Sequence, residues 1–522
     1  MMVERFKRDL IKEFRNYDRM MLMQDLMAGL TVTAVAIPLA LAFGVGSGAT
    51  AASGLVTAII AGVIISALGG AYFQISGPTG AMAAILMSII AQYGLQGVFV
   101  ATVLAGIILV IAGVLHLGKL ISFIPMPVIS GFTSGIAVII AMGQIDNFFG
   151  VTSEGSSVTE KFLSYWQLGL FVMLMMLLFP MRYSKYIPSS LFAIIVATAA
   201  NIALNLDVAV VGNIPATLIL DDRLELASLL DFRTVIGLLA PAVSIAVLAM
   251  IESLLCGATA SRMTGARLDS NRELLAQGIG NIIVPFFGGI PATAAIARTS
   301  VAVKSGAVTR LTGIFHALGI LLAMFVLAPV MSQIPLAALA GVLMVVSWRM
   351  NEWVTINFIL KGKFKGAILK FVVTMLTTII VDLTTAIMIG VIIGLVLQAV
   401  RFSHLRITYD EIDPQRLHEE IEDLPDDGLV CYINGPIVFA NTERLEEIPK
   451  KAKRYGYVYF SMRGVPDIDI SGVQEFAKIV QEMKDGGKKI YLCSLQDEAM
   501  EMLKRGGVYD MIGQDAVYWS VE

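Results

Sequence analysis

Charge is scarce in this sequence. Asp, Glu, Lys and Arg make up 15% of its 522 residues, while hydrophobic residues make up 57%. Soluble globular domains carry about 25% charged residues. No charged residue occurs from Leu26 to Gly118, and such a run has room for about four membrane-spanning helices of roughly 20 residues each. The composition therefore excludes an ordinary soluble protein and predicts an integral membrane protein.

Cysteine and histidine are scarce as well. The three cysteines, Cys256, Cys431 and Cys493, are too few and too scattered for a disulfide framework. The four histidines and the lack of a Cys-x-x-Cys motif give no metal-ligand pattern, so no metal or cofactor is expected. His116 and His316 fall in different hydrophobic windows and form no Ser-His or His-metal cluster. An intramembrane enzyme is therefore not expected.

The first 25 residues alternate basic and acidic side chains around Phe6, Leu10, Ile11 and Phe14. This pattern predicts an amphipathic helix that lies at the membrane surface. Its lysines and arginines favour the cytoplasmic side. The segment lacks a small-residue cleavage site, so a removable signal peptide is not expected.

Fourteen hydrophobic windows follow, two of them short. They lie at residues 26–45, 53–70, 78–92, 97–116, 126–148, 165–180, 187–205, 234–256, 273–287, 292–303, 311–330, 335–348, 367–381 and 384–400. Lysines and arginines gather in the junctions that this count places inside, and the outside loops 149–162 and 206–233 are mainly acidic. The charge pattern thus supports fourteen spans. Twelve spans with two re-entrant half-helices satisfy the same rule.

Two glycine–proline segments interrupt the hydrophobic windows. They are Gly77-Pro78-Thr79 and Gly289-Ile290-Pro291. Each is typical of a half-helix that begins inside the membrane, with glycine for the turn and proline at the first helical position. Two facing helix N-termini would form an anion site near the midplane of an inverted-repeat transporter. The alternative is that each segment only ends one span and starts the next.

The composition changes after Arg401. Residues 402–424 are rich in Asp and Glu and are predicted to be a linker, and residues 425–522 show soluble periodicities. Strands are predicted at 429–433, 436–439, 457–461 and 489–493, and helices at 441–455, 471–486 and 496–505. The alternation predicts a small α/β domain behind a transport domain at 26–401.

Several motifs resemble the SulP anion transporter family, which includes the sulfate permeases and solute carrier 26. They are Gln24-Asp25-Leu26 leading to Ile37-Pro38-Leu39, Ile75-Ser76-Gly77-Pro78-Thr79, Ile251-Glu252-Ser253, Gly288-Gly289-Ile290-Pro291 and Arg298-Thr299. The C-terminal part resembles a STAS domain. The resemblance implies a polytopic α-helical membrane protein with about 14 spans in two inverted seven-span repeats, which form a core and a gate domain. It also implies a cytoplasmic STAS domain and, often, a homodimer.

The resemblance also implies roles for individual residues. The expected substrate-binding residues are Phe43, Gln74, Thr79, Ala294, Ala295, Ile296 and Arg298, and the expected ion-coupling residues are Glu252 and Cys256. Members that resemble a sodium–bicarbonate transporter have Asp at the position of Glu252 and Thr one turn later, where this chain has Cys256. Residues 295–297 lack the hydroxyl groups of some members, so backbone N–H groups are expected to supply most donors.

Each candidate also has a structural interpretation. Glu252 either couples transport to an ion or pairs with Arg298, and Arg298 either binds the anion or extends to the cytoplasmic surface. Thr79 and Thr293 either bind substrate or cap the half-helices, with capping favoured for Thr293. Packing is favoured for Phe43 and Cys256.

The C-terminal domain contains one candidate modification site. Ser471 matches the loop where some STAS proteins are phosphorylated, although a helix N-cap is the favoured interpretation. Gly486-Gly487-Lys488 lacks the spacing of a nucleotide-binding motif and predicts a turn.

The expected function is secondary active transport of a small anion, of sulfate type, across the cell membrane. Protonation of Glu252 would remove its repulsion of an incoming anion, and a hard cation such as sodium would find Cys256 a poor ligand, so proton symport is favoured. Sodium-coupled transport of bicarbonate or a C4-dicarboxylate is the alternative. Anion exchange, a channel or voltage-driven motor, and a membrane-bound sensor also remain open.

Overall fold

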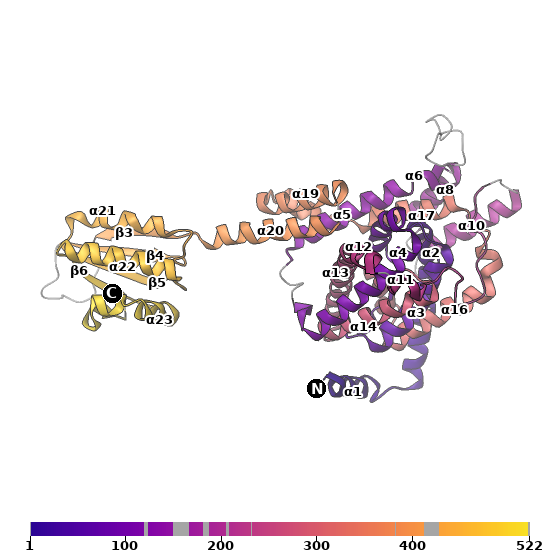
Figure 1. The fold of residues 1–522 in the computed structure, drawn as a ribbon, viewed down its shortest axis with the longest axis horizontal. Coiled ribbons are helices and arrows are strands. Elements are labelled where there is room, and N and C mark those ends of the chain that lie inside the picture. The colour runs from indigo at the N-terminus through magenta and orange to yellow at the C-terminus, as the bar shows by residue number, and fades with distance from the viewer. Residues whose placement is uncertain are drawn as a thin grey trace. The chain divides into compact units, whose positions relative to one another are not determined.

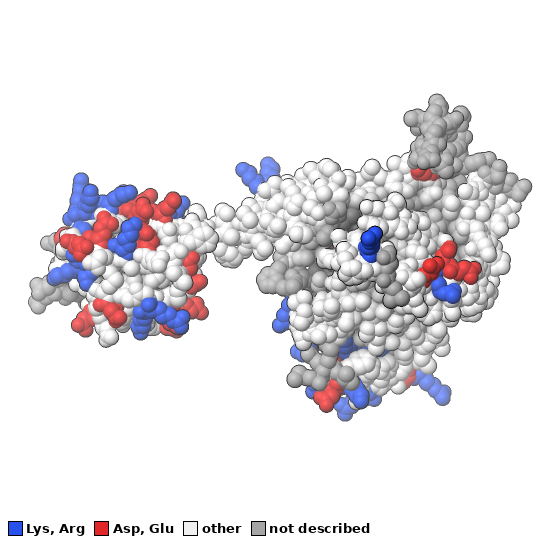
Figure 2. Space-filling view, viewed as in Figure 1, with Lys and Arg blue, Asp and Glu red and all other residues white. Residues whose placement is uncertain are grey.

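The computed structural model describes residues 2–119, 124–149, 166–180, 187–204, 208–230, 232–381, 383–411 and 427–519. The chain divides into two compact units, Met1–Val391 and Ile392–Glu522. The first unit is almost entirely helical, and the second contains an α/β sheet (Figure 1). In Figure 2 the visible face of the first unit is largely uncharged, whereas the second unit carries both signs of charge over its visible surface.

The helices that precede the sheet follow the hydrophobic windows, and the last of them, α20 Leu383–Phe402, continues from the first unit into the second. They are α1 Met2–Phe14, α2 Arg19–Gly46, α3 Ala51–Leu68, α4 Gly80–Val114, α5 Met126–Gly143, α6 Ile145–Phe149, α8 Trp166–Leu178, α10 Ser189–Leu204, α11 Leu226–Leu230, α12 Phe232–Gly237, α13 Leu239–Thr264, α14 Ser270–Ile283, the 3₁₀ turn η2 Val284–Phe287, α15 Ile296–Lys304, α16 Leu311–Met331, α17 Leu336–Met350, α18 Trp353–Lys361, α19 Lys365–Ile380 and α20 Leu383–Phe402. Each of the fourteen windows contains helix. Seven helical segments in the described chain are long and apolar enough to cross a membrane.

Two predicted windows correspond to the two halves of one kinked element. Helix α4 covers both 78–92 and 97–116, and Gly94 divides it with a non-helical backbone, at φ 68° and ψ −175°. Glycine adopts this left-handed conformation without a Cβ clash. The predicted division into two spans is therefore present as a break inside α4.

The N-terminal segment is shorter than predicted. The amphipathic helix α1 ends at Phe14, and α2 begins at Arg19 instead of at residue 26. Helix α18, which lies between the predicted windows 335–348 and 367–381, is an additional element.

Small residues bring the helices of the first unit close together. A Cβ on Gly106 of α4 would lie 2.7 Å from the carbonyl oxygen of Gly278 on α14, and a Cβ on Gly278 would lie 2.7 Å from the carbonyl oxygen of Gly106. Close backbone approach of this kind holds membrane helices together, because lipid supplies no hydrophobic force between them. Helix α14 also packs on α3, while α16 packs on α2 and α3.

The second unit is a five-stranded mixed sheet with helices. Its elements are β3 Arg406–Glu411, β4 Gly428–Asn434, η4 Thr442–Glu446, α21 Glu447–Lys451, η5 Ala452–Arg454, β5 Tyr457–Gly464, α22 Ile470–Asp485, β6 Lys489–Cys493, α23 Asp497–Arg505, α24 Val508–Ile512, η6 Gln514–Ala516 and β7 Val517–Tyr518. The strand order is β3-β4-β5-β6-β7, with β3 antiparallel to β4 and the other neighbours parallel. This unit has a hydrophobic core of its own.

Several predictions for the second unit are corrected. Strand β3 lies inside the predicted linker 402–424, and its start fits the buried Leu405 in the core of this unit. Residues 436–439 form only an isolated bridge, Ile437 to Ile468, instead of a strand. The predicted helix 441–455 is three short turns, because the proline in α21 lacks the N–H that a continuous helix needs.

The N-cap predicted for Ser471 is wrong. Asp469 caps α22, and its Oδ1 accepts a hydrogen bond from the Gly472 N–H at 2.7 Å. Ser471 is exposed in the first turn, and its phosphorylation stays a prediction.

All three cysteines are free and buried, as the cysteine count predicted. In the second unit, burial raises the pKa of the Cys431 thiol to about 12 and that of Cys493 to about 11. Neither thiol is therefore ionised near neutral pH.

Asp25 ties the start of α2 to the start of α16. Its fully buried carboxylate accepts hydrogen bonds from the N–H groups of Val308 and Thr309 at 2.7 and 2.9 Å, and from the hydroxyls of Thr309, Thr312 and Tyr17 at 2.5, 2.7 and 2.9 Å. The carboxylate thus satisfies donors at a helix start that has no side-chain cap of its own.

Replacement of Asp25 should destabilise the first unit strongly. Asp25→Ala leaves five donors without this acceptor, and we expect it to lower the free energy of unfolding by about 3 kcal/mol or more. Asp18→Ala is the matched control, because it removes one exposed cap bond, to Met21, and should cost about 1 kcal/mol. Thermal unfolding in detergent measures both. Equal losses for the two variants would contradict the role given to Asp25.

Candidate functional site

Two short strands meet inside the first unit. Strand β1, Ser76–Gly77, pairs antiparallel with β2, Thr293–Ala294, and the Ala295 N–H donates to the Ile75 carbonyl at 2.9 Å. Helix α4 starts at Gly80 directly after β1, and α15 starts at Ile296 directly after β2. The pairing therefore brings two helix N-termini together from distant parts of the chain, as the sequence predicted.

The helix starts differ in detail from the prediction. Neither proline takes the first helical position, because Pro78 precedes the N-cap of α4 and Pro291 lies before β2. The cap of α4 is Thr79, whose hydroxyl accepts from the Met82 N–H at 3.4 Å. The cap of α15 is Ala295, which has no side-chain hydrogen bond. The capping role favoured for Thr293 is therefore wrong.

The start of α15 is the more open of the two. No side chain of the residues that the structure describes caps its first-turn amides, those of residues 296–298. The side chain of Ile296 is 44% exposed, whereas Ala294 is buried and Ala295 is half-buried. The N–H groups of Ala294 and Ala295 are already used, by the hydroxyl of Ser253 at 3.2 Å and by Ile75. An anion at this helix end would therefore meet the amides of residues 296–298.

Glu252 contacts Thr79, which follows β1, and Thr293 of β2. Its Oε2 accepts from the hydroxyl of Thr79 at 2.8 Å and from the hydroxyl of Thr293 at 2.5 Å, and the two hydroxyl oxygens are 3.1 Å apart. The Glu252 side chain is half-buried. No ion pair joins Glu252 to Arg298, two residues that the structure describes in full, so the structural pair considered from the sequence is not formed.

Arg298 points into the protein and not to the membrane surface. Its side chain is 1% exposed, and its Nη2 donates to the Pro78 carbonyl at 2.9 Å. Nη1 has no hydrogen-bond partner among the described residues. A Cβ on Gly77 would lie 2.7 Å from this atom, so a glycine leaves room for the guanidinium beside β1. The extension of Arg298 to the surface is therefore excluded.

The other predicted residues surround this arrangement. The Gln74 Nε2 donates to the Ser253 carbonyl at 2.9 Å, while its Oε1 is buried without a partner among the described residues. Phe43 is buried against the start of α4, since a Cβ on Gly80 would lie 3.1 Å from its ring. The Cys256 thiol is buried and donates to the Thr299 hydroxyl at 3.2 Å, which fits a packing residue.

Several polar residues at the site were not identified from the sequence. They are Thr57, Ser76, Ser253, Gln277, Asn281 and Thr299, each hydrogen-bonded to β1, β2 or a neighbouring residue. A signal existed for two of them. Gln277 and Asn281 follow Glu273 at intervals of four residues, which places three polar side chains on one face of a helix within the window 273–287.

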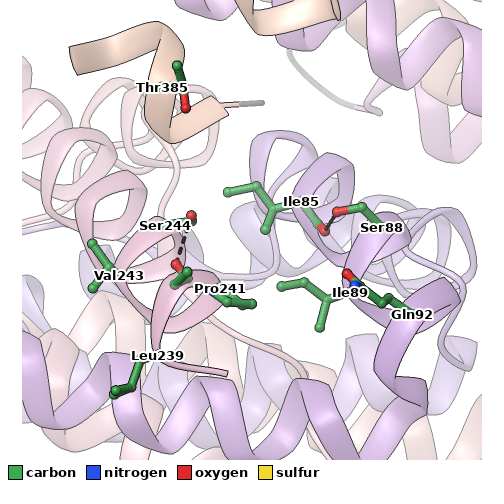
Figure 3. A pocket seen from close by; sticks show the side chains of 10 residues that line it. Ile85, Ser88, Ile89, Gln92, Leu239, Pro241, Val243, Ser244 and Thr385 are labelled. Carbon is green, nitrogen blue, oxygen red and sulfur yellow. Dashed lines mark hydrogen bonds between the residues drawn. The ribbon is translucent and has the colours of Figure 1, made fainter. Parts of the chain in front are cut away.

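A cavity of about 610 Å³ lies along α4 and α13, away from the start of α4 and from Glu252. It is lined by Ile85, Ser88, Ile89, Gln92, Leu239, Ala240, Pro241, Val243, Ser244 and Thr385. In Figure 3, Thr385 of α20 faces Ser244 of α13 and Ile85 of α4 across the open space. Ser88 follows the start of α4 by eight residues, and Ser244 precedes Glu252 by eight residues, which is about 12 Å along each helix. None of the described residues that line the cavity is charged.

Comparison with known families and proteins gives extensive matches. Residues 22–374 match the sulfate permease family, and residues 419–522 match the STAS domain. YvdB of Bacillus subtilis (strain 168), named as a sulfate transporter, is 36% identical over 524 residues that cover 96% of this chain and 97% of that protein. The bicarbonate transporter BicA of a Synechocystis species is 29% identical and covers 97% of this chain and 93% of that protein.

Solved structures agree with the fold. The transmembrane domain of a cyanobacterial bicarbonate transporter BicA superimposes with a TM-score of 0.63 and 29% identity, and covers 73% of this chain and 98% of that structure. Murine Slc26a9 in the inward-facing state superimposes with a TM-score of 0.80 and 18% identity, over 97% of this chain and 91% of that structure. The second match shows the fold alone.

These matches confirm the helical membrane transporter fold with a C-terminal STAS domain. The relatives are transporters and not enzymes, in agreement with the prediction from the sequence. The chain belongs to the sulfate permease family and is an anion transporter of that family.

Proposed function

We propose that the protein is a secondary active transporter that carries a small oxyanion, of sulfate type, together with protons by alternating access. The observation that carries the proposal is the junction at β1 and β2, where two helix N-termini, Arg298 and Glu252 come together. We further propose a homodimer in the cell membrane, with the N-terminus and the STAS domain on the cytoplasmic side.

The anion is proposed to bind at the start of α15. The amides of a first helical turn carry partial positive charge, and those of residues 296–298 have no side-chain cap. The Nη1 of Arg298 lies nearby with no partner among the described residues. Fixed N–H donors together with one buried cation favour a compact anion.

Proton coupling is favoured by the number of hydrogens around Glu252. Three oxygens, from Glu252, Thr79 and Thr293, approach one another at 2.5, 2.8 and 3.1 Å. Two hydroxyls supply two hydrogens, so an ionised Glu252 leaves one of the three contacts without a hydrogen. A proton on Oε2 would supply the third hydrogen, and Oε2 would then donate to one of the two hydroxyl oxygens in place of accepting from it. The geometry therefore fits a protonated Glu252.

Sodium is the less favourable coupling ion. A hard cation prefers several oxygen ligands, and the thiol of Cys256 instead donates to Thr299. Sodium-coupled bicarbonate transport is the alternative function, because BicA is named as a bicarbonate transporter at 29% identity. Sulfate is preferred because YvdB, at 36% identity, is named for sulfate.

The cavity in Figure 3 is proposed as part of the outer approach to the site. It lies along the same two helices that carry Thr79 and Glu252, toward the end of α13 that follows the predicted outside loop 206–233. The polar side chains among its described lining residues are uncharged, which suits passage of an anion more than its retention.

Bulk at the N-cap of α15 should block transport. Ala295→Leu would cover the amides of residues 296–298, and we expect anion uptake to fall at least tenfold while the protein stays folded. Ala91→Leu, on an exposed position of α4, is the matched control. Uptake of labelled sulfate in proteoliposomes and size-exclusion profiles provide the measurements. Normal uptake by a well-folded Ala295→Leu protein would exclude this site.

Removal of the charge on Glu252 should separate binding from coupling. Glu252→Gln is permanently neutral, so we expect exchange of labelled anion across the membrane to survive, and accumulation driven by a pH gradient to be lost. Glu225→Gln, at an exposed position, is the control and should accumulate normally. Accumulation that follows a sodium gradient at fixed pH would show that the proton proposal is wrong.

Removal of the STAS domain should leave selectivity unchanged. The predicted site residues that bind or couple all lie in the first unit, and strand β3 requires the deletion to begin at residue 403 instead of 425. We expect the 403–522 deletion to change the uptake rate or the expression level and to keep the order of anion preference. A competition panel measures that order, and a changed order would contradict the division of roles.

A further inference from the structure

We propose that Gln277 and Asn281 of α14 are positioning residues that set the spacing between the two helix N-termini, and through it the selectivity for anions. The inference rests on the proposed anion site. Neither side chain has a place among the expected site residues, and both act through the strands that hold the site.

The two residues belong to a fully buried polar stripe. Glu273, Gln277 and Asn281 recur every four residues along α14, and each is 0% exposed. Polar side chains are costly to bury inside a membrane span unless they are hydrogen-bonded. Glu273 and Asn281 bond to backbone groups that precede β1 and β2, and Gln277 bonds to the side chain of Ser76 in β1.

Glu273 and Gln277 hold the β1 side. The Oε2 of Glu273 accepts from the Gly70 N–H at 3.0 Å, before β1. The Nε2 of Gln277 donates to Oε1 of Glu273 at 2.9 Å and to the hydroxyl oxygen of Ser76 at 3.0 Å. Ser76 is the β1 residue that faces Ala294 of β2. Gln277 therefore connects α14 to the strand that leads into α4.

Asn281 holds the β2 side. Its Nδ2 donates to the Ala292 carbonyl at 2.9 Å, and its Oδ1 accepts from the Ala292 N–H at 2.8 Å. The side chain thus pairs with both polar groups of one backbone residue, in the way that a neighbouring strand would. Ala292 directly precedes β2, which leads into α15.

One rigid helix therefore positions both strands. Residues four apart on a helix are about 6 Å apart along its axis, which is close to the separation of about 5 Å between paired strands. Helix α14 is itself fixed against α4 by the contact between Gly106 and Gly278. A change at Gln277 or Asn281 would let one strand shift, and the distance between the two N-termini would change with it.

This arrangement predicts a particular kinetic effect. Loss of either connection should raise the KM for sulfate about tenfold, which corresponds to one buried hydrogen bond of about 1.4 kcal/mol. The preference for sulfate over a planar or a larger anion should change as well, because the spacing determines which anion fits. The maximal rate at saturating anion should stay within about twofold of the wild type.

The experiment compares Gln277→Met and Asn281→Leu with the full-length wild type in proteoliposomes. Both substitutions keep the approximate side-chain size and remove the hydrogen bonds. Thr102→Val is the matched control, because the Thr102 hydroxyl is fully buried in α4 and bonds only to Val98 of its own helix. KM, maximal rate and the preference among sulfate, bicarbonate and malate are measured for each protein. The rise in melting temperature with added sulfate gives binding without transport.

The outcomes distinguish this inference from the proposed function. A raised KM and a changed preference in both variants, with a normal Thr102→Val, support it. The inference would be overturned if KM and the anion preference stay unchanged. It would also be overturned if only the melting temperature and the maximal rate fall. If the variants do not fold, Gln277→Ser and Asn281→Ser, whose shorter side chains can bond to a carbonyl of their own helix and no longer reach the strands, give the same test. A wild type that transports no anion would instead count against the proposed function, and the sulfate-dependent melting shift would still test the positioning.

Discussion

The structure of the first unit depends on the pairing of β1 with β2. Inside a membrane every backbone N–H and C=O must find a partner within the protein, so a helix can be broken only where another segment completes its hydrogen bonds. Strand pairing and the side chains of Thr57 and Asn281 complete them here, for residues 290–295. The first-turn amides of α15, those of residues 296–298, have no side-chain cap among the described residues, and this is where we propose that the anion binds.

Small residues make this arrangement possible. Gly77 leaves room for the guanidinium of Arg298, and Gly106 with Gly278 lets α14 approach α4 closely enough for its polar side chains to reach the strands. A larger side chain at any of these positions would move backbone that the site depends on. The high glycine content of the spans therefore serves both packing and the geometry of the site.

The charges at the site are few and opposed. Arg298 is fully buried and contacts a carbonyl, while Glu252 is bound by two hydroxyls and forms no ion pair with it. The guanidinium of Arg298 and the carboxyl group of Glu252, which is charged only when it is deprotonated, are kept apart in a low-dielectric region, where each responds strongly to an ion that enters. This separation gives a physical basis for the proposed linkage between anion and proton binding.

The sequence by itself determined the class, because the uncharged run from Leu26 to Gly118 has no stable place outside a membrane. The helices and the break near Gly94 also followed from local chemistry, and the two glycine–proline segments were expected to meet because an inverted-repeat transporter brings its half-helices together. Only the tertiary structure decided which hydroxyl caps which helix, where Arg298 points and what α14 binds. Those outcomes depend on contacts between residues such as Thr79 and Thr293, 214 positions apart, and local propensity carries no information about such distant partners.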